Sequence, residues 1–186
     1  MRHVLLALTL SMALVGCQGN EGPDSSATTK VSGSDVELYF SPNGGCTEAV
    51  VRTLGAARQT VLVQAYSFTS APIAQAVVDA YRRGVKVQVI LDKSNETEKY
   101  SAADFLAHGG VPVLIDDKHE IAHNKIMIID GETVITGSFN FTKAAEEHNA
   151  ENLLVIHNRE LAAKYEKNYQ EHLAHSVKYE RRGQGE

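Results

Sequence analysis

Several common features are scarce or absent in this chain of 186 residues. Two cysteines, Cys17 and Cys46, allow at most one disulfide. The formal charge is −5, and losing Arg2 with a leader would leave −6. The chain as a whole therefore lacks the basic charge expected of a protein that wraps nucleic acid, although local cations such as Lys125 and Lys143 could still form a groove. The one long apolar run, residues 4–15, is shorter than the roughly 20 residues that span a bilayer as a helix. No internal repeat is visible, so the chain carries no second copy of any motif described below.

The N-terminal segment is typical of an export signal. Residues 1–16 place Arg2 before the apolar run and end at Leu14-Val15-Gly16-Cys17, which resembles the lipobox of bacterial lipoproteins. This resemblance implies cleavage before Cys17 and its lipidation; ordinary cleavage without lipid is the alternative, and would permit a Cys17–Cys46 bond. Gln18, rather than an aspartate, follows the cysteine, which resembles the pattern of lipoproteins sent on to the outer membrane. We therefore expect a bacterial cell-envelope protein, in the outer membrane or the periplasm, that contacts membrane only through the lipid.

The rest of the chain divides into a tether and one domain. Residues 17–34 have almost nothing to bury and predict a flexible tether, whereas residues 35–186 suffice for one core. Apolar patterning predicts alternating strands and helices, which indicates an α/β domain with a mixed, largely parallel sheet. The strands are expected at residues 36–40, 60–67, 85–91, 111–115 and 152–157, and the helices at 47–58, 72–83, 98–108 and 159–175. Residues 178–186 are charged and expected to fray.

The chemistry is concentrated in one stretch, His123-Asn124-Lys125, followed by four apolar residues, Asp130-Gly131, a return strand at 133–136, and Gly137-Ser138-Phe139-Asn140. The apolar run ending in Asp-Gly predicts a buried strand entering a tight hairpin. Side chains alternate along a strand, so His123 shares a face with Lys125, and Ser138 with Asn140. Such a group suits a phosphodiester, because imidazole can attack phosphorus while ammonium and amide stabilise the oxygens that gain charge.

This His-x-Lys, Asp, Gly-Ser-x-Asn spacing resembles the signature of the phospholipase D superfamily. Ala65-Tyr66-Ser67-Phe68-Thr69, residues 137–146 and Glu151-Asn152 further resemble the small bacterial endonucleases of that superfamily that carry one signature per chain. The likeness covers residues 36–169. It implies a phospholipase D-like fold, no cofactor and no metal, and cleavage of DNA, with RNA left open, without sequence specificity.

The resemblance also implies roles for single residues. It makes His123 the nucleophile, Lys125 and Asn140 the phosphate-binding residues, Ser138 their support, and Glu151 the carboxylate that orients the imidazole. Asp130 differs in strand parity from Lys125, so we expect a structural turn residue first and a catalytic residue second. Gly137 is expected to allow close approach of the phosphate or a neighbouring strand.

One signature supplies one histidine, yet the departing alkoxide needs a general acid. The small nucleases that the chain resembles form two-fold dimers in which both subunits contribute a signature to one site. We therefore expect a homodimer in which one His123 attacks phosphorus and the other protonates the leaving oxygen.

Three other functions remain open from the sequence. A phospholipase D or phosphatidyl transferase would fit the membrane tether. His119-Glu120-Ile121-Ala122-His123 matches the zinc-peptidase pattern His-Glu-x-x-His, with Glu146, Glu147 or Glu151 as a third ligand, but requires a helix. A non-catalytic envelope lipoprotein could retain the signature for binding.

Overall fold

The computed structural model describes residues 29–30 and 35–180. The expected signal peptide, the lipidated Cys17 and most of the expected tether lie outside these residues, and those predictions stay predictions. Within the described part no helix is both long and apolar enough to cross a membrane.

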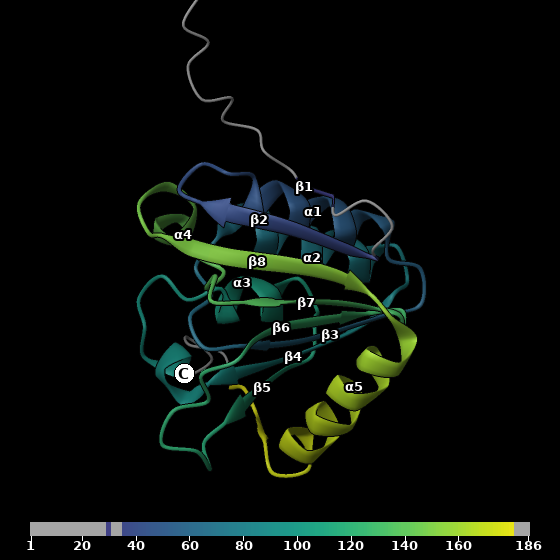
Figure 1. Ribbon diagram of the computed structural model, residues 1–186. Helices are drawn as coiled ribbons and strands as arrows, with labels where there is room; N and C mark the ends of the chain where they lie inside the picture. The colour runs from purple at the N-terminus through teal and green to yellow at the C-terminus, as the bar shows by residue number, and fades with distance from the viewer. Residues whose placement is uncertain (1–28, 31–34, 181–186) are drawn as a thin grey trace, which may run out of the picture.

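A nine-stranded sheet forms the centre of the described part, in the order β1-β2-β8-β7-β6-β3-β4-β5-β9 (Figure 1). Only the pairings of β3 with β4 and of β4 with β5 are parallel; the other six are antiparallel. The strands are β1 (Thr29–Lys30), β2 (Val36–Ser41), β3 (Thr60–Ala65), β4 (Lys86–Asp92), β5 (Val113–Asp116), β6 (Lys125–Ile129), β7 (Thr133–Gly137), β8 (Glu151–His157) and β9 (Val177–Lys178).

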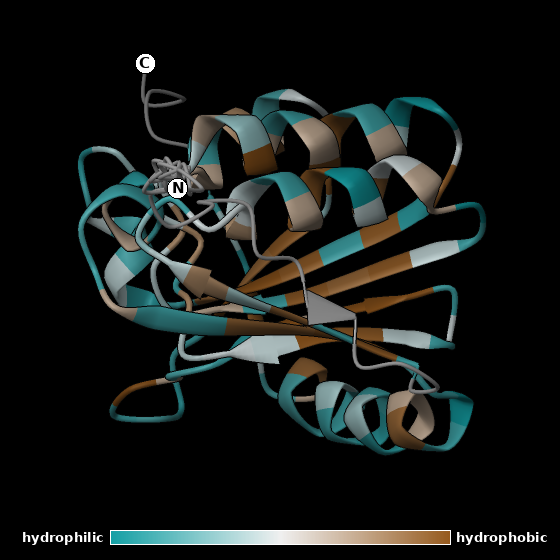
Figure 2. Cartoon of the chain, turned by 45° about the horizontal axis from the view of Figure 1, so that its top comes forward, coloured by the Kyte–Doolittle hydropathy of each residue, from teal (hydrophilic) through white to brown (hydrophobic). Residues whose placement is uncertain are grey.

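Helices cover both faces of the sheet (Figure 2). They are α1 (Cys46–Ala56), α2 (Ala71–Arg82), the 3₁₀ turn η1 (Lys93–Glu96), α3 (Ala103–His108), α4 (Lys143–Glu147) and α5 (Arg159–Leu173). A larger apolar cluster includes buried residues of α1, α2 and α3, and a smaller one on the opposite face includes Ala162 and Tyr169 of α5. This three-layer arrangement confirms the α/β class predicted from alternating patterns.

Two parts of the fold prediction are wrong. The sheet is mixed but mostly antiparallel. The strands β2, β8, β7 and β6 pair with one another in antiparallel fashion, and only β3, β4 and β5 pair in parallel, through helical crossovers. The tail does not fray at its start: β9 pairs with β5, and Tyr179 is 5% exposed while its amide donates to the Val113 carbonyl at 3.0 Å.

Smaller differences concern the ends of the elements. Two residues expected in the tether, Thr29 and Lys30, pair with β2. The helix expected at 98–108 begins only at Ala103, after η1. Cys46 is fully buried at the start of α1, where burial raises its thiol pKa to about 12, as suits a structural thiol.

Candidate active site

The signature residues other than Asp130 lie at one edge of the sheet, formed by the ends of its central strands. β6 runs antiparallel to both β3 and β7, and β7 runs antiparallel to β8. The end of β3, the start of β6, the end of β7 and the start of β8 therefore meet at the same edge. Lys125 begins β6 opposite Ala65, and Gly137 ends β7 opposite Leu153. This confirms the hairpin and explains how residues separated by a turn can face one ligand.

His123 lies at this edge just before β6, and it is exposed. Its ring packs against Tyr66, with ring centroids 4.6 Å apart, and the Tyr66 amide donates to the Asn124 carbonyl at 2.8 Å. Within the described residues no hydrogen bond occupies the His123 ring nitrogens, which leaves them open to a ligand. Tyr66 was missed as a site residue, although its place directly after β3 was a usable signal.

Lys125 is buried, at 8% exposure, yet its ammonium reaches the same edge. Nζ donates to the His123 carbonyl at 3.2 Å and lies 5.2 Å from the centre of the Tyr66 ring. Burial lowers the pKa of Lys125, and the negative charge of Glu151 opposes that effect. The partly desolvated Lys125 ammonium lies beside the exposed His123 imidazole, so an anionic oxygen of a ligand would bind favourably next to both.

The turn after β7 requires glycine and is fixed by Asn152. Gly137 has a φ of 150°, and a Cβ there would lie 2.2 Å from the Asn152 carbonyl oxygen. That oxygen accepts the amides of Ser138 and Phe139, while the Ser138 hydroxyl accepts both the Asn152 amide at 3.1 Å and its side-chain Nδ2 at 3.2 Å. Gly137 thus permits close approach of the neighbouring strand. This is one of the two alternatives predicted from the sequence, the other being close approach of the phosphate.

Asn140 follows on the same loop between two buried aromatic residues. Phe139 and Phe141 are 0% and 1% exposed, and Phe141 packs edge-on against Phe68. These phenylalanines hold the loop onto the core and are too buried to stack on bases. In the described structure the Oδ1 atom of Asn140 is buried without a hydrogen-bond partner, so this amide is not fully committed to the fold.

Glu151 opens β8 at the same edge, but the structure does not join it to His123. Its Oε1 accepts Asn149 Nδ2 at 3.2 Å, and its amide donates to the Ser41 hydroxyl at 3.2 Å. Its negative charge raises the pKa of Lys125, against the larger effect of burial. An orienting role toward the imidazole therefore remains a prediction.

Asp130 lies at the opposite end of β6. Its carboxylate accepts three backbone amides, those of Arg58, Gln59 and Thr60, at 2.9, 2.7 and 2.9 Å. Because β6 separates it from Lys125, Asp130 is not brought to the site, which supports the structural role and argues against the catalytic one. Burial would raise its pKa, but these hydrogen bonds outweigh burial and lower it.

Replacing Asp130 with asparagine should destabilise the domain without altering catalysis per folded molecule. Asparagine tolerates the positive φ of 54° at this position but lacks the charge, so we expect a loss of about 1–2 kcal/mol near pH 7. A lowered carboxyl pKa stabilises the fold above the unfolded-state value and ceases to do so as pH falls through the folded-state value. The difference should therefore be full above about pH 4 and should shrink as the pH falls further, through the lowered pKa of the folded protein. Urea unfolding of both proteins across pH measures this; a hundredfold loss of turnover instead would restore a catalytic role.

The zinc-peptidase alternative is wrong. Residues 117–124 form no helix, so His119 and His123 do not lie one helical turn apart. The three proposed third ligands have other partners. Glu146 accepts the Gly45 and Thr47 amides at the start of α1, Glu147 lies 3.5 Å from Lys143, and Glu151 accepts Asn149 Nδ2.

The buried carboxylate of Asp92 holds the loop that carries His123. Asp92, at the end of β4, accepts the Ala122 amide through Oδ2 at 2.7 Å and the Ser94 amide through Oδ1 at 2.9 Å. Asp92 is 3% exposed. It therefore positions the residue next to the nucleophile candidate, a role that sequence pattern alone did not indicate.

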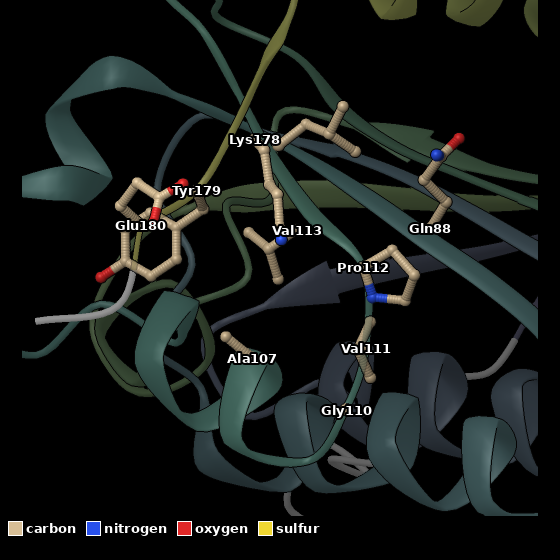
Figure 3. Close-up of a pocket in the computed structure, with 10 residues that line it drawn as sticks. Gln88, Ala107, Gly110, Val111, Pro112, Val113, Lys178, Tyr179 and Glu180 are labelled. Atoms are coloured by element: carbon tan, nitrogen blue, oxygen red, sulfur yellow. The ribbon is translucent and has the colours of Figure 1, made fainter. Parts of the chain in front are cut away.

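A pocket elsewhere does not compete as the active site. Its lining comes from Gln88 of β4, the end of α3, the start of β5 and the segment around β9 (Figure 3). None of the signature residues borders it. The candidate site lies instead at the ends of the central strands β6, β7 and β8, where His123 is exposed.

Known proteins resemble this chain in sequence and structure. Residues 50–173 match the family model described as "Cardiolipin synthase, PLD-like domain". A phospholipase D of Rickettsia felis is 44% identical over 136 residues, covering 73% of this chain and 68% of the relative. A mitochondrial cardiolipin hydrolase of Xenopus laevis is 33% identical over 65% of this chain and 57% of its own length.

Two solved structures match almost over their whole length. Nuc of Salmonella typhimurium, a phospholipase D family member, has a TM-score of 0.75 and 37% identity, covering 77% of this chain and 97% of its own. NucT of Helicobacter pylori has a TM-score of 0.72 and 30% identity, covering 77% and 98%. With the signature residues other than Asp130 brought to one end of the central strands, these matches show that the chain belongs to the phospholipase D superfamily and is a phosphodiesterase of that superfamily.

Proposed function

We propose that this protein is an endonuclease that cleaves DNA through a phosphohistidine, without a metal in the chemical step, in an active site shared by two identical subunits. The observation that carries the proposal is the gathering of His123, Lys125 and Asn140 at one sheet edge in a chain with a single signature. The near-complete match to the solved structures of Nuc and NucT supports a compact enzyme of that kind.

The chemical steps use only imidazoles and water. A neutral His123 attacks phosphorus, the bond from phosphorus to the leaving sugar oxygen breaks, and the partner's His123, protonated, gives its proton to that oxygen. The second imidazole then removes a proton from water, which attacks phosphorus and releases the first imidazole. One fragment ends in a phosphate monoester and the other in a hydroxyl.

Lys125 and Asn140 provide electrostatic stabilisation in these steps. Both would donate to the non-bridging oxygens, whose negative charge grows as the nucleophile arrives. The low exposure of Lys125 strengthens such an interaction, since less water screens it. Because one imidazole must be neutral and the other protonated, activity should show a bell-shaped dependence on pH.

The partner subunit supplies the missing acid. A two-fold axis beside His123 would bring the second copy of this histidine to the same phosphate. Ile121, 55% exposed and two residues before His123, is a large apolar side chain that such a partner could cover.

A second candidate is a phospholipase D acting on lipid, favoured by the names of the Rickettsia relatives and by the cardiolipin-synthase description of the family model. A substrate comparison in excess EDTA separates the two. We expect cutting of plasmid and single-stranded DNA and no release of headgroups from phosphatidylcholine or cardiolipin vesicles. Hydrolysis of vesicles alone would contradict the nuclease proposal, and inactivity on every substrate would favour a non-catalytic lipoprotein.

A matched histidine variant shows that the activity belongs to this protein. His157 lies at the far end of β8 from Glu151, so His157→Ala should cut DNA as the wild type does. His123→Ala should not. Equal cutting by both variants would indicate a contaminating nuclease.

A further inference from the structure

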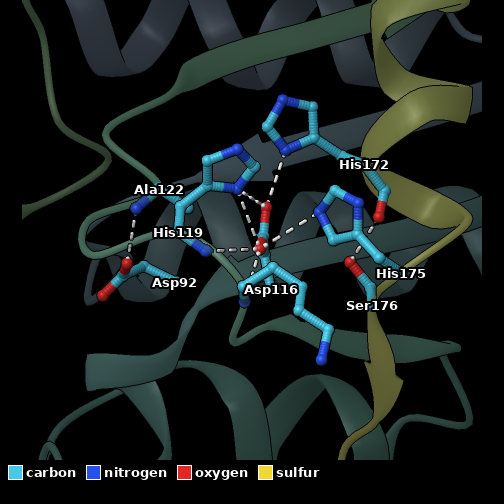
Figure 4. A network of polar contacts seen from close by, with 8 residues as sticks. Asp92, Asp116, His119, Ala122, His172, His175 and Ser176 are labelled. Atoms are coloured by element: carbon cyan, nitrogen blue, oxygen red, sulfur yellow. Dashed lines mark hydrogen bonds and ion pairs between the residues drawn. The ribbon is translucent and has the colours of Figure 1, made fainter.

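Three histidines surround one buried carboxylate outside the candidate active site. Asp116 ends β5, His119 follows it in the loop, His172 lies in the last turn of α5, and His175 comes just after that helix. Figure 4 shows the three imidazoles converging on the carboxylate from two sides. The spacings Asp-x-x-His and His-x-x-His are visible in the sequence, but only the packing of α5 against the sheet brings them together.

The distances suit ligands around a metal ion. His119 and His172 place Nδ1 at 2.9 and 2.6 Å from Asp116 Oδ2, and His175 places Nε2 at 3.3 Å from Oδ1. All four ligand atoms lie within 4.8 Å of one another. Ligands at about 2.0–2.1 Å from tetrahedral zinc lie about 3.4 Å apart, so shifts on the order of 1 Å would complete the coordination.

Hydrogen bonds within the cluster do not satisfy all of its buried polar atoms. In the described structure His175 Nε2 is buried without a hydrogen-bond partner, even though it faces the carboxylate. The Asp116 oxygens already accept the Lys118 amide at 3.2 Å and two imidazoles, so a third imidazole has little left to bond. A buried ring nitrogen without a partner indicates a missing ligand.

The carboxylate lies at the centre of the cluster. Asp116 is fully buried, and its Oδ2 atom is bonded by the Nδ1 atoms of His119 and His172. Three imidazoles and one carboxylate form a donor set that suits zinc and neighbouring divalent transition metals rather than magnesium or calcium.

We propose that Asp116, His119, His172 and His175 bind one divalent transition-metal ion, with zinc the best fit, in a structural role. The ion would tie the end of α5 to loop 117–124, whose other attachments include the hydrogen bonds from Ala122 to Asp92 and from Tyr66 to the Asn124 carbonyl. This site shares only His119 with the rejected peptidase pattern and includes neither Glu120 nor His123. It takes no part in the phosphodiester chemistry.

Metal titration of the purified protein tests the proposal without any substrate. After removal of bound metal by a chelator and dialysis, we expect one equivalent of Zn²⁺ per chain by calorimetry. Co²⁺ should give the intense visible absorption of a tetrahedral site. At a free Zn²⁺ concentration a hundredfold above Kd, the melting temperature should rise by about 5–10 °C.

Single-ligand variants decide whether these residues hold the ion. His172→Ala and His175→Ala should each weaken Zn²⁺ binding about a hundredfold and abolish the thermal shift. His157→Ala, which removes a histidine that also lies beside a carboxylate, Glu37 at 3.6 Å, should change neither. If His172→Ala does not fold by circular dichroism, His175→Ala and Asp116→Asn carry the test.

Two outcomes would overturn the proposal. Binding below one equivalent per chain would mean that the cluster is only a hydrogen-bonded network centred on Asp116. Stoichiometric binding that survives His172→Ala and His175→Ala would place the metal elsewhere. Neither outcome bears on DNA cleavage, which is measured separately in EDTA at a temperature where the metal-free protein stays folded.

Discussion

His123→Ala should abolish phosphodiester cleavage, with turnover reduced by about 10⁴-fold or more. The substitution removes the attacking nitrogen from one subunit and the proton donor from the other, so both halves of the reaction fail. His123 is exposed, and among the described residues its ring packs against Tyr66 without a hydrogen bond from either ring nitrogen, so the fold should survive. Single-turnover assays on a labelled oligonucleotide in EDTA measure the loss.

A trapped intermediate provides an independent readout. Wild-type protein quenched in alkali during turnover, where the phosphorus–nitrogen bond of phosphohistidine survives, should carry a DNA fragment joined through its phosphate to a histidine. Mass spectrometry on the peptide containing His123 detects this adduct. Retention of more than about a tenth of the activity in His123→Ala would contradict the role assigned to this residue. Unchanged circular dichroism and melting temperature would exclude misfolding as the cause of a loss.

Lys125→Met should reduce turnover by about 10²–10³-fold, the usual effect of removing one group that stabilises a developing oxyanion. Methionine keeps much of the length and apolar stem of lysine, so the buried position at the start of β6 remains filled. The missing charge matters most when the phosphoryl oxygens become more negative. The loss should therefore fall mainly on kcat, and less on KM.

Two comparisons test this interpretation of Lys125. Lys125→Arg keeps the charge, so it should recover part of the activity that methionine loses, although the guanidinium fits the 3.2 Å contact to the His123 carbonyl differently. Lys143, an exposed lysine paired with Glu147, serves as the matched control, and Lys143→Met should change kcat little. An effect confined to KM would make Lys125 a general binding residue rather than one that stabilises the transition state.

Local pattern was enough to predict the hairpin and its polar residues. The apolar run closed by Asp130-Gly131 fixed a strand, a turn and a return strand, and strand alternation then placed His123 and Lys125 together. The same argument separated Asp130 from Lys125. These inferences hold because each depends on residues close in sequence.

Contacts between distant segments could not be predicted in this way. No local rule pairs β2 with β8, so the sheet was expected to be more parallel than it is. The His172 side chain reaches Asp116, 56 residues earlier in the chain, only when α5 packs beside β5. Asp92 likewise reaches Ala122 across 30 residues.

Mixing wild-type subunits with His123→Ala subunits is the most direct test of the shared active site. If each site needs both copies of His123, an equimolar mixture with random exchange should retain about one quarter of the wild-type activity per total protein, because only wild-type pairs are active. Native mass spectrometry of differently tagged chains confirms the exchange. Retention of about one half, in direct proportion to the wild-type fraction, would show that each subunit works alone and would contradict the account.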